Sequence, residues 1–167
     1  EAREIAEQII DVLHGPLQGS VDKPRTYRQK ARKDYLSAAK ARRLSSGKRR
    51  VAIGKQLRYV HRDLLHIERL LTYEIVTLML LSPRQYRKLL VIHELYRQQK
   101  QMFDQRCHHI DGRIVSISQP HIRPIVRGKA NAPTEFGAKL SAALIGGYAF
   151  LDQIGWDNFN ESTRLTE

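Results

Sequence analysis

The feature that most constrains the fold is a pair of long helical patterns that meet at Ser82-Pro83. Over about residues 48–81 and again from Pro83 to about residue 106, apolar side chains recur every three or four positions, as on one face of a helix. Serine is a good N-cap, and proline is well tolerated at the first helical position. The sequence therefore predicts an antiparallel helical hairpin over about residues 48–107, whose two apolar stripes pack against each other.

Two further helices are expected before the hairpin. Residues 2–14 form an amphipathic pattern that ends at Gly15-Pro16. Residues 25–44 form a strongly basic pattern with a narrow, weakly apolar face, so this helix is expected to be stable only when it is docked or bound.

The character of the chain changes after Cys107. Arg113–Ser118 is a short β-prone run, and two strands are expected over about residues 135–145 and 148–156, joined by Gly146-Gly147. Asn158 or Asn160 is suited to cap a final helix. The predicted fold class is therefore α+β, with a mainly helical part over residues 1–112 and a β-containing part over residues 113–167.

A tight Gly146-Gly147 turn would place Ile145 opposite Tyr148 and make Lys139 a diagonal neighbour of Asp152. A cross-strand ion pair is the favoured interpretation of these two charges. The alternative is a metal-binding carboxylate on a strand, but a two-metal site needs several converging carboxylates.

The chain of 167 residues has one cysteine, which excludes a disulfide framework and a cysteine-based zinc finger. Its longest apolar run, Ile75–Leu81, is far shorter than the roughly 20 residues that a membrane-spanning helix needs. No partnership with a membrane is expected.

The positive charge is concentrated in one segment. Lysine and arginine number 29 against 17 acidic residues, a net charge of +12, and residues 23–62 hold 15 of these cations with Asp34 as their one acid. Such a segment repels itself unless a polyanion lies nearby, and nucleic acid is the usual candidate. The alternatives are a solvated helix face and an acidic protein neighbour.

Phosphate contacts are therefore predicted along this basic segment and along the extended, proline-rich stretch 119–129. The candidate DNA-binding residues are Arg28, Lys30, Arg32, Lys33, Arg42, Arg43, Lys48, Arg49, Arg50, Lys55, Arg123, Arg127 and Lys129.

No catalytic or metal-binding residue is assigned. The spacing of Cys107-His108-His109 and Asp111 matches no standard metal site, and a polar helix end is the favoured interpretation. A metal hydrolase built on Asp111, Asp152 and Asp157 would require these three carboxylates to converge.

Several ordered motifs resemble the middle of a bacterial insertion-sequence transposase of the DDE class, in the large group labelled insertion sequence five. The resemblance covers essentially the whole chain. The motifs are Pro24–Arg32, Glu94–Gln99, Arg113–Ser116, Arg123–Lys129, Glu135–Lys139, Phe150–Asp152, Trp156-Asp157 and Asn160-Glu161.

The resemblance implies part of a ribonuclease-H-like core, in which two aspartates and a glutamate hold a divalent metal such as Mg²⁺ for DNA cleavage and joining. None of the three carboxylates has a matching position here, so the chain is expected to be a fragment that is inactive by itself. The implied role is DNA-backbone binding and core scaffolding in DNA transposition, with self-association, in the bacterial cytoplasm at the nucleoid. The alternative is a stand-alone basic helical module that binds RNA or an acidic protein without catalysis.

Overall fold

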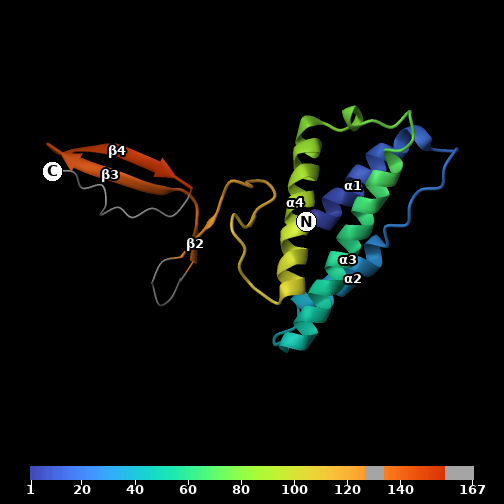
Figure 1. Ribbon diagram of the computed structural model, residues 1–167, viewed down its shortest axis with the longest axis horizontal. Helices are drawn as coiled ribbons and strands as arrows, with labels where there is room; N and C mark the ends of the chain where they lie inside the picture. Colours follow the sequence, from blue (N-terminus) through green and yellow to red (C-terminus); the bar gives the residue numbers. More distant parts are fainter. Residues whose placement is uncertain (127–133, 157–167) are drawn as a thin grey trace. The chain divides into compact units, whose positions relative to one another are not determined.

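The computed structural model describes residues 1–126 and 134–156, and the chain divides into two compact units (Figure 1). The first unit, Glu1–Ile110, is helical, and the second, Asp111–Glu167, contains the strands. The fold is therefore a mixture of helices and small antiparallel sheets, of the α+β class.

The core of the helical unit is built around α1 (Ala2–His14), which is followed by the short 3-10 helix η1 (Gly15–Leu17). Ile9, Ile10 and Leu13 are fully buried, because α1 packs against both α3 (Ser46–Leu70) and α4 (Pro83–Gln105). The two long helices therefore pack against α1 as well as against each other, and this third partner was not predicted from the sequence. The apolar face of α1 needs a partner, and the paired helices supply it.

The long helices run antiparallel beside each other, as the Ser82-Pro83 junction predicts (Figure 1). Ser82 caps α4 with a capping box: its Oγ accepts a hydrogen bond from Gln85 N at 3.2 Å, and Gln85 Oε1 accepts one from Ser82 N at 2.9 Å. The start of α4 is thus fixed by its own local sequence.

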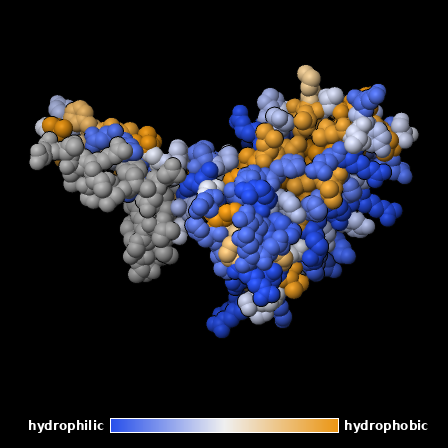
Figure 2. All heavy atoms as spheres, viewed as in Figure 1, coloured by the Kyte–Doolittle hydropathy of each residue, from blue (hydrophilic) through white to orange (hydrophobic). Residues whose placement is uncertain are grey.

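Helix α3 ends at Leu70, about eleven residues before the predicted end. A turn-rich segment that contains η2 (Leu78–Leu80) follows and contacts α1, and its Val76 and Leu81 are buried. Met79, by contrast, is 92% exposed. Figure 2 shows hydrophobic residues gathered on the helical unit around the end where α3, η2 and α4 meet.

Helix α2 (Arg28–Ala39) is shorter than the predicted basic helix over residues 25–44. It begins after Tyr27, whose φ of +53° is left-handed, and ends at Ala39, with Lys40 as its C-cap. Ala31 is buried against the rest of the unit, whereas Arg32 and Lys33 are exposed. This thin contact agrees with the narrow apolar face of the sequence.

In the second unit, β1 (Pro124–Val126) pairs with β2 (Thr134–Phe136), and β3 (Lys139–Ile145) pairs with β4 (Tyr148–Gly155), both antiparallel. The predicted single strand over residues 135–145 is split at Gly137, whose φ of +142° interrupts the extended chain. The β-prone run Arg113–Ser118 is irregular, although Ile114 and Ile117 are buried. The helix expected after Asn158 or Asn160 lies outside the described residues.

The β3–β4 hairpin has the predicted Gly146-Gly147 turn, and Ile145 pairs with Tyr148. A bulge then shifts the register, because Ala142 pairs with Leu151 but Ser141 pairs with Gln153. Asp152 is the extra residue. Lys139 consequently lies opposite Gly155 and is no longer a diagonal neighbour of Asp152, so the predicted cross-strand relationship was wrong.

Apolar side chains are exposed on both faces of this hairpin. Leu144 on one face is 76% exposed, and Tyr148 on the other is 74% exposed. The bulge adds Ile154 to the face of Leu140 and Leu144, because Leu140 pairs with Ile154.

Candidate nucleic-acid interface

The basic segment is displayed by α2, by the connection after it and by the first half of α3. Arg32, Lys33 and Lys40 lie along one side of α2, where they line a shallow depression together with Leu36. We call these three cations the α2 strip. Lys40 was not among the predicted contacts, although it follows Lys33 by seven residues, the spacing that returns a helical chain to the same side.

The end of α2 and the first turn of α3 form a second basic surface. We call it the basic corner, and it consists of Lys40, Arg42, Arg43, Lys48 and Arg49, all exposed. Ser45 caps α3 and accepts a hydrogen bond from Lys48 N at 3.4 Å. The partial positive charge of the helix N-terminus adds to the side-chain charges here, so this corner is strongly attractive to anions.

Most of the predicted cations in the helical unit are available to a ligand. Among the described residues, no carboxylate lies within ion-pair distance of seven exposed members. These are Lys30, Arg32, Lys33, Arg42, Arg43, Lys48 and Arg49. Exposed cations without an ion-pair partner can pair with an external phosphate.

Arg28 is instead paired with groups of α1. Its Nη2 donates to Glu7 O at 2.9 Å and also contacts the Asp11 carboxylate, so the guanidinium joins α2 to α1. Burial opposes ionisation of Asp11, but hydrogen bonds from Arg28 and Lys23 lower its pKa below the ordinary value. The hydrogen bond with Asp11 in turn raises the pKa of Arg28.

Arg50 and Lys55 also have partners within the helical unit. Arg50 Nη1 donates to Phe103 O at 2.7 Å. Lys55 Nζ lies 3.4 Å from Asp34 Oδ1, and Asp34 Oδ2 accepts a hydrogen bond from Tyr59 Oη at 2.9 Å.

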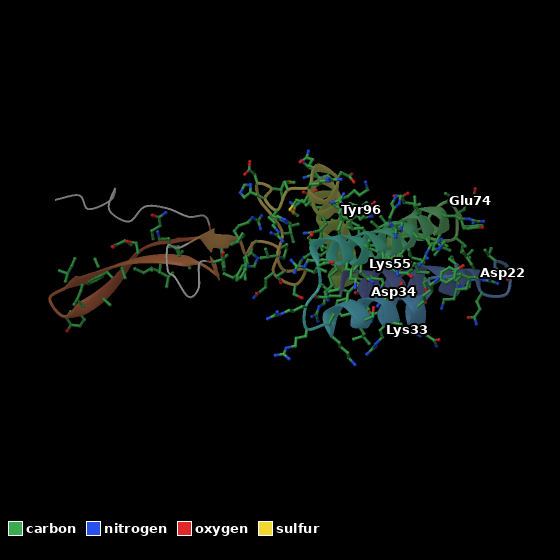
Figure 3. The ribbon with its side chains drawn as sticks, turned by 90° about the horizontal axis from the view of Figure 1, so that it is seen from below. Asp22, Lys33, Asp34, Lys55, Glu74 and Tyr96 are labelled. Carbon is green, nitrogen blue, oxygen red and sulfur yellow. The ribbon has the colours of Figure 1, made fainter. Side chains whose placement is uncertain are left out.

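The carboxylate of Asp34 is therefore compensated within the fold. The Tyr59 hydrogen bond and the Lys55 charge lower the pKa of Asp34, which keeps it ionised. In Figure 3, Asp34 lies between α2 and α3 beside Lys55, whereas Lys33 lies on the outer side of α2. Asp34 is the one acidic residue of the basic segment 23–62, and this feature of the sequence is a signal that it pairs with a cation within the fold.

Three of the predicted DNA-binding residues lie in the second unit, and one of them is among the described residues. Arg123 Nη1 donates to the carbonyl oxygen of Pro120 and to that of Ile122, the second at 3.2 Å. Arg127 and Lys129 lie outside the described residues.

A buried ionisable cluster lies between α1 and α3. Asp63 is fully buried, and its nearest cation is Arg62, with Nη2 at 3.7 Å from Oδ1. Burial raises the pKa of Asp63 to about 7, with a further upward contribution from Glu7, although Arg62 and Arg3 oppose the shift. Arg3 pairs with Glu7 in the same region. This cluster belongs to the core of the unit rather than to its basic surface.

The described residues do not fit the divalent-metal site that the transposase resemblance implies. Over residues 1–126 and 134–156, no three His, Cys, Asp or Glu side chains are grouped so that they could hold a metal ion. Cys107 follows α4, and its Sγ lies 3.4 Å from His109 O. Asp111 and Asp152 are among the described residues, whereas Asp157 is not.

No family model, curated protein or solved structure matches the chain. Among the helices that the structure describes, none combines the length and apolar character that a bilayer crossing requires.

Proposed function

We propose that the helical unit binds the phosphate backbone of DNA through the basic corner and the α2 strip. The observation that carries this proposal is the run of exposed cations, from Lys30 to Arg49, without ion-pair partners among the described residues. Each cation that neutralises a phosphate releases condensed counterions, and this release drives sequence-independent binding. Five of these cations form the basic corner, where one polyanion can contact all of them together.

We propose further that the chain is part of a DDE transposase acting in DNA transposition, in the bacterial cytoplasm at the nucleoid. The motif resemblance supports this setting. The exposed apolar side chains on both faces of the β3–β4 hairpin add support, since strands covered on both faces are typical of a larger sheet such as a ribonuclease-H-like core. In that setting the chain contributes DNA binding and scaffold to a self-associating complex.

The alternative proposal is a stand-alone module for RNA. It is favoured by the exposure of Tyr27 (51%) and Tyr35 (56%) within the basic segment, because exposed aromatic rings stack on unpaired bases. Competition between duplex DNA and RNA for the protein separates the two proposals.

The test of phosphate binding is the salt dependence of affinity for a short DNA duplex. We expect the logarithm of the binding constant to fall linearly with the logarithm of salt concentration, with a slope of about −0.9 per phosphate contacted. The double variant Arg42→Gln/Arg43→Gln should reduce that slope by up to about 2.

The matched control is Arg84→Gln/Arg87→Gln, which removes the same charge from exposed positions of α4. Its slope should equal that of the parent chain. A flat salt dependence of the parent, or equal slopes for both double variants, would reject the proposal.

A further inference from the structure

A largely apolar groove of about 420 Å³ lies beside the basic corner. Helices α2, α3 and α4 form its walls. Ala38 from α2, Ala52 from α3 and Leu95 from α4 represent the three walls. The alanines leave room for a flat group to approach the helix backbones closely.

Two tyrosine rings line this groove. Tyr35 projects from α2 and is 56% exposed, so part of its ring is accessible at the rim. Tyr96 projects from α4, and its ring is stacked in parallel on His61 with the centroids 5.3 Å apart. The His61 contact fixes the orientation of the Tyr96 ring.

The groove and the basic surface share a border. Arg49 of the basic corner is itself a lining residue. Arg32 of the α2 strip precedes Tyr35 by three positions, so the two are neighbours on the helix surface. Asp34 also lines the groove, but its charge is compensated by Lys55 and Tyr59. An occupant of this groove therefore meets an apolar floor and a cationic border.

We propose that the groove receives an unpaired base of the nucleic acid whose phosphates lie on the basic corner, an inference that rests on the function proposed above. Charge complementarity selects this occupant: a polypeptide would need its own acidic residues at the border, whereas every nucleotide carries a phosphate next to its base. The faces of a base are apolar and stack on aromatic side chains. The amide of Gln99 in the lining can hydrogen-bond the edge of the base, and so can the amide oxygen of Gln56, whose Nε2 donates to Ala31 O at 3.2 Å.

The experiment compares three DNA duplexes by fluorescence anisotropy: a perfect duplex, one with a single bulged nucleotide, and one with an abasic bulge at the same place. The two bulges share the same backbone and differ only in the base. We expect the base-bearing bulge to bind about tenfold more tightly than the abasic one.

Two variants test whether the preference for the base-bearing bulge arises in the groove. Tyr35→Ala removes the ring, and Ala38→Leu fills the groove, so each should reduce the tenfold difference to about one. The control Tyr86→Ala removes another exposed tyrosine, on α4 outside the groove lining, and should keep the difference. Circular dichroism of each variant establishes that the helices are retained.

The outcomes separate this inference from the function on which it rests. Salt-dependent binding with equal affinity for the base-bearing and abasic bulges would overturn the base site and leave phosphate binding intact. A tenfold difference that survives both Tyr35→Ala and Ala38→Leu would also overturn it. Failure of all three duplexes to bind would reject the proposed function itself.

Discussion

The guanidinium of Arg50 lies over the ring of Phe103, with its central carbon 4.0 Å from the ring centre, and Nη1 donates to the Phe103 carbonyl oxygen at 2.7 Å. This contact joins the first turns of α3 to the last turns of α4. Arg49, the preceding residue, is exposed at the basic corner. Of these two adjacent arginines, Arg50 thus stabilises the helical unit, whereas Arg49 is available for the proposed DNA binding.

The first prediction compares the effects of replacing each arginine on stability and on DNA binding. Arg50→Gln should lower the free energy of unfolding by about 1–3 kcal/mol, because it removes a charged hydrogen bond and a cation–π contact. Arg49→Gln should leave stability within about 0.5 kcal/mol and weaken DNA binding. Urea denaturation and anisotropy measure the two effects, and a reversed order of stabilities would contradict the assignment.

The second prediction concerns the contact of Gly54 with Phe103. A Cβ at Gly54 would lie 3.0 Å from Phe103 Cζ, so the branched side chain of Gly54→Val should overpack the interface and cost about 1–3 kcal/mol. At Gly47, in the first turn of α3, a Cβ meets nothing within 4 Å. Gly47→Ala should therefore stabilise the chain by about 0.4–1 kcal/mol. Thermal unfolding of both variants gives the comparison.

The third prediction follows from Asp63. Burial raises its pKa from 3.8 to about 7, so the folded chain keeps a proton that the unfolded chain releases between these pH values. The stability that this group contributes is fully present below about pH 4 and is lost as the pH rises through about 7.

Asp63→Asn should remove the loss of folding stability that accompanies ionisation of the buried carboxyl group. The stability of the variant relative to the parent should rise by on the order of 4 kcal/mol when the pH is raised from 4 to 8. Urea denaturation at a series of pH values measures the difference, and a difference that does not change with pH would show that Asp63 ionises normally in the folded chain.

The fourth prediction compares two helix caps. Ser82→Ala removes the capping box of α4 and should cost about 1 kcal/mol. Ser45→Ala should cost less, because the hydrogen bond from Lys48 N to Ser45 Oγ is long, at 3.4 Å. Equal losses in thermal unfolding would mean that cap geometry does not set the stability of these helix starts.

Features that depend on neighbouring residues could be predicted from the sequence. The start of α4 at Ser82-Pro83 and the Gly146-Gly147 turn are examples, since a cap or a glycine pair acts within a few residues. The end of α3 at Leu70 and the bulge at Asp152 could not be predicted. The first depends on which apolar side chains the rest of the unit buries, and the second on strand pairing beyond the turn.

The same distinction applies to the basic surface. Charge density identified the segment, but it gave no sign that Arg28 pairs with Asp11 or that Arg50 contacts Phe103. These partners lie 17 and 53 residues away along the chain, and only the packing of α1 and α4 brings them close. The groove beside Arg49 is likewise assembled from separate helices.

The most direct test of the central claim is a titration of the isotopically labelled chain with a short DNA duplex, followed by the backbone amide shifts in nuclear magnetic resonance spectra. The account predicts that the largest, salt-sensitive shifts fall on the α2 strip and the basic corner, between Arg32 and Arg49. Shifts concentrated instead on the η2 segment or the β3–β4 hairpin, with residues 32–49 unchanged, would contradict it.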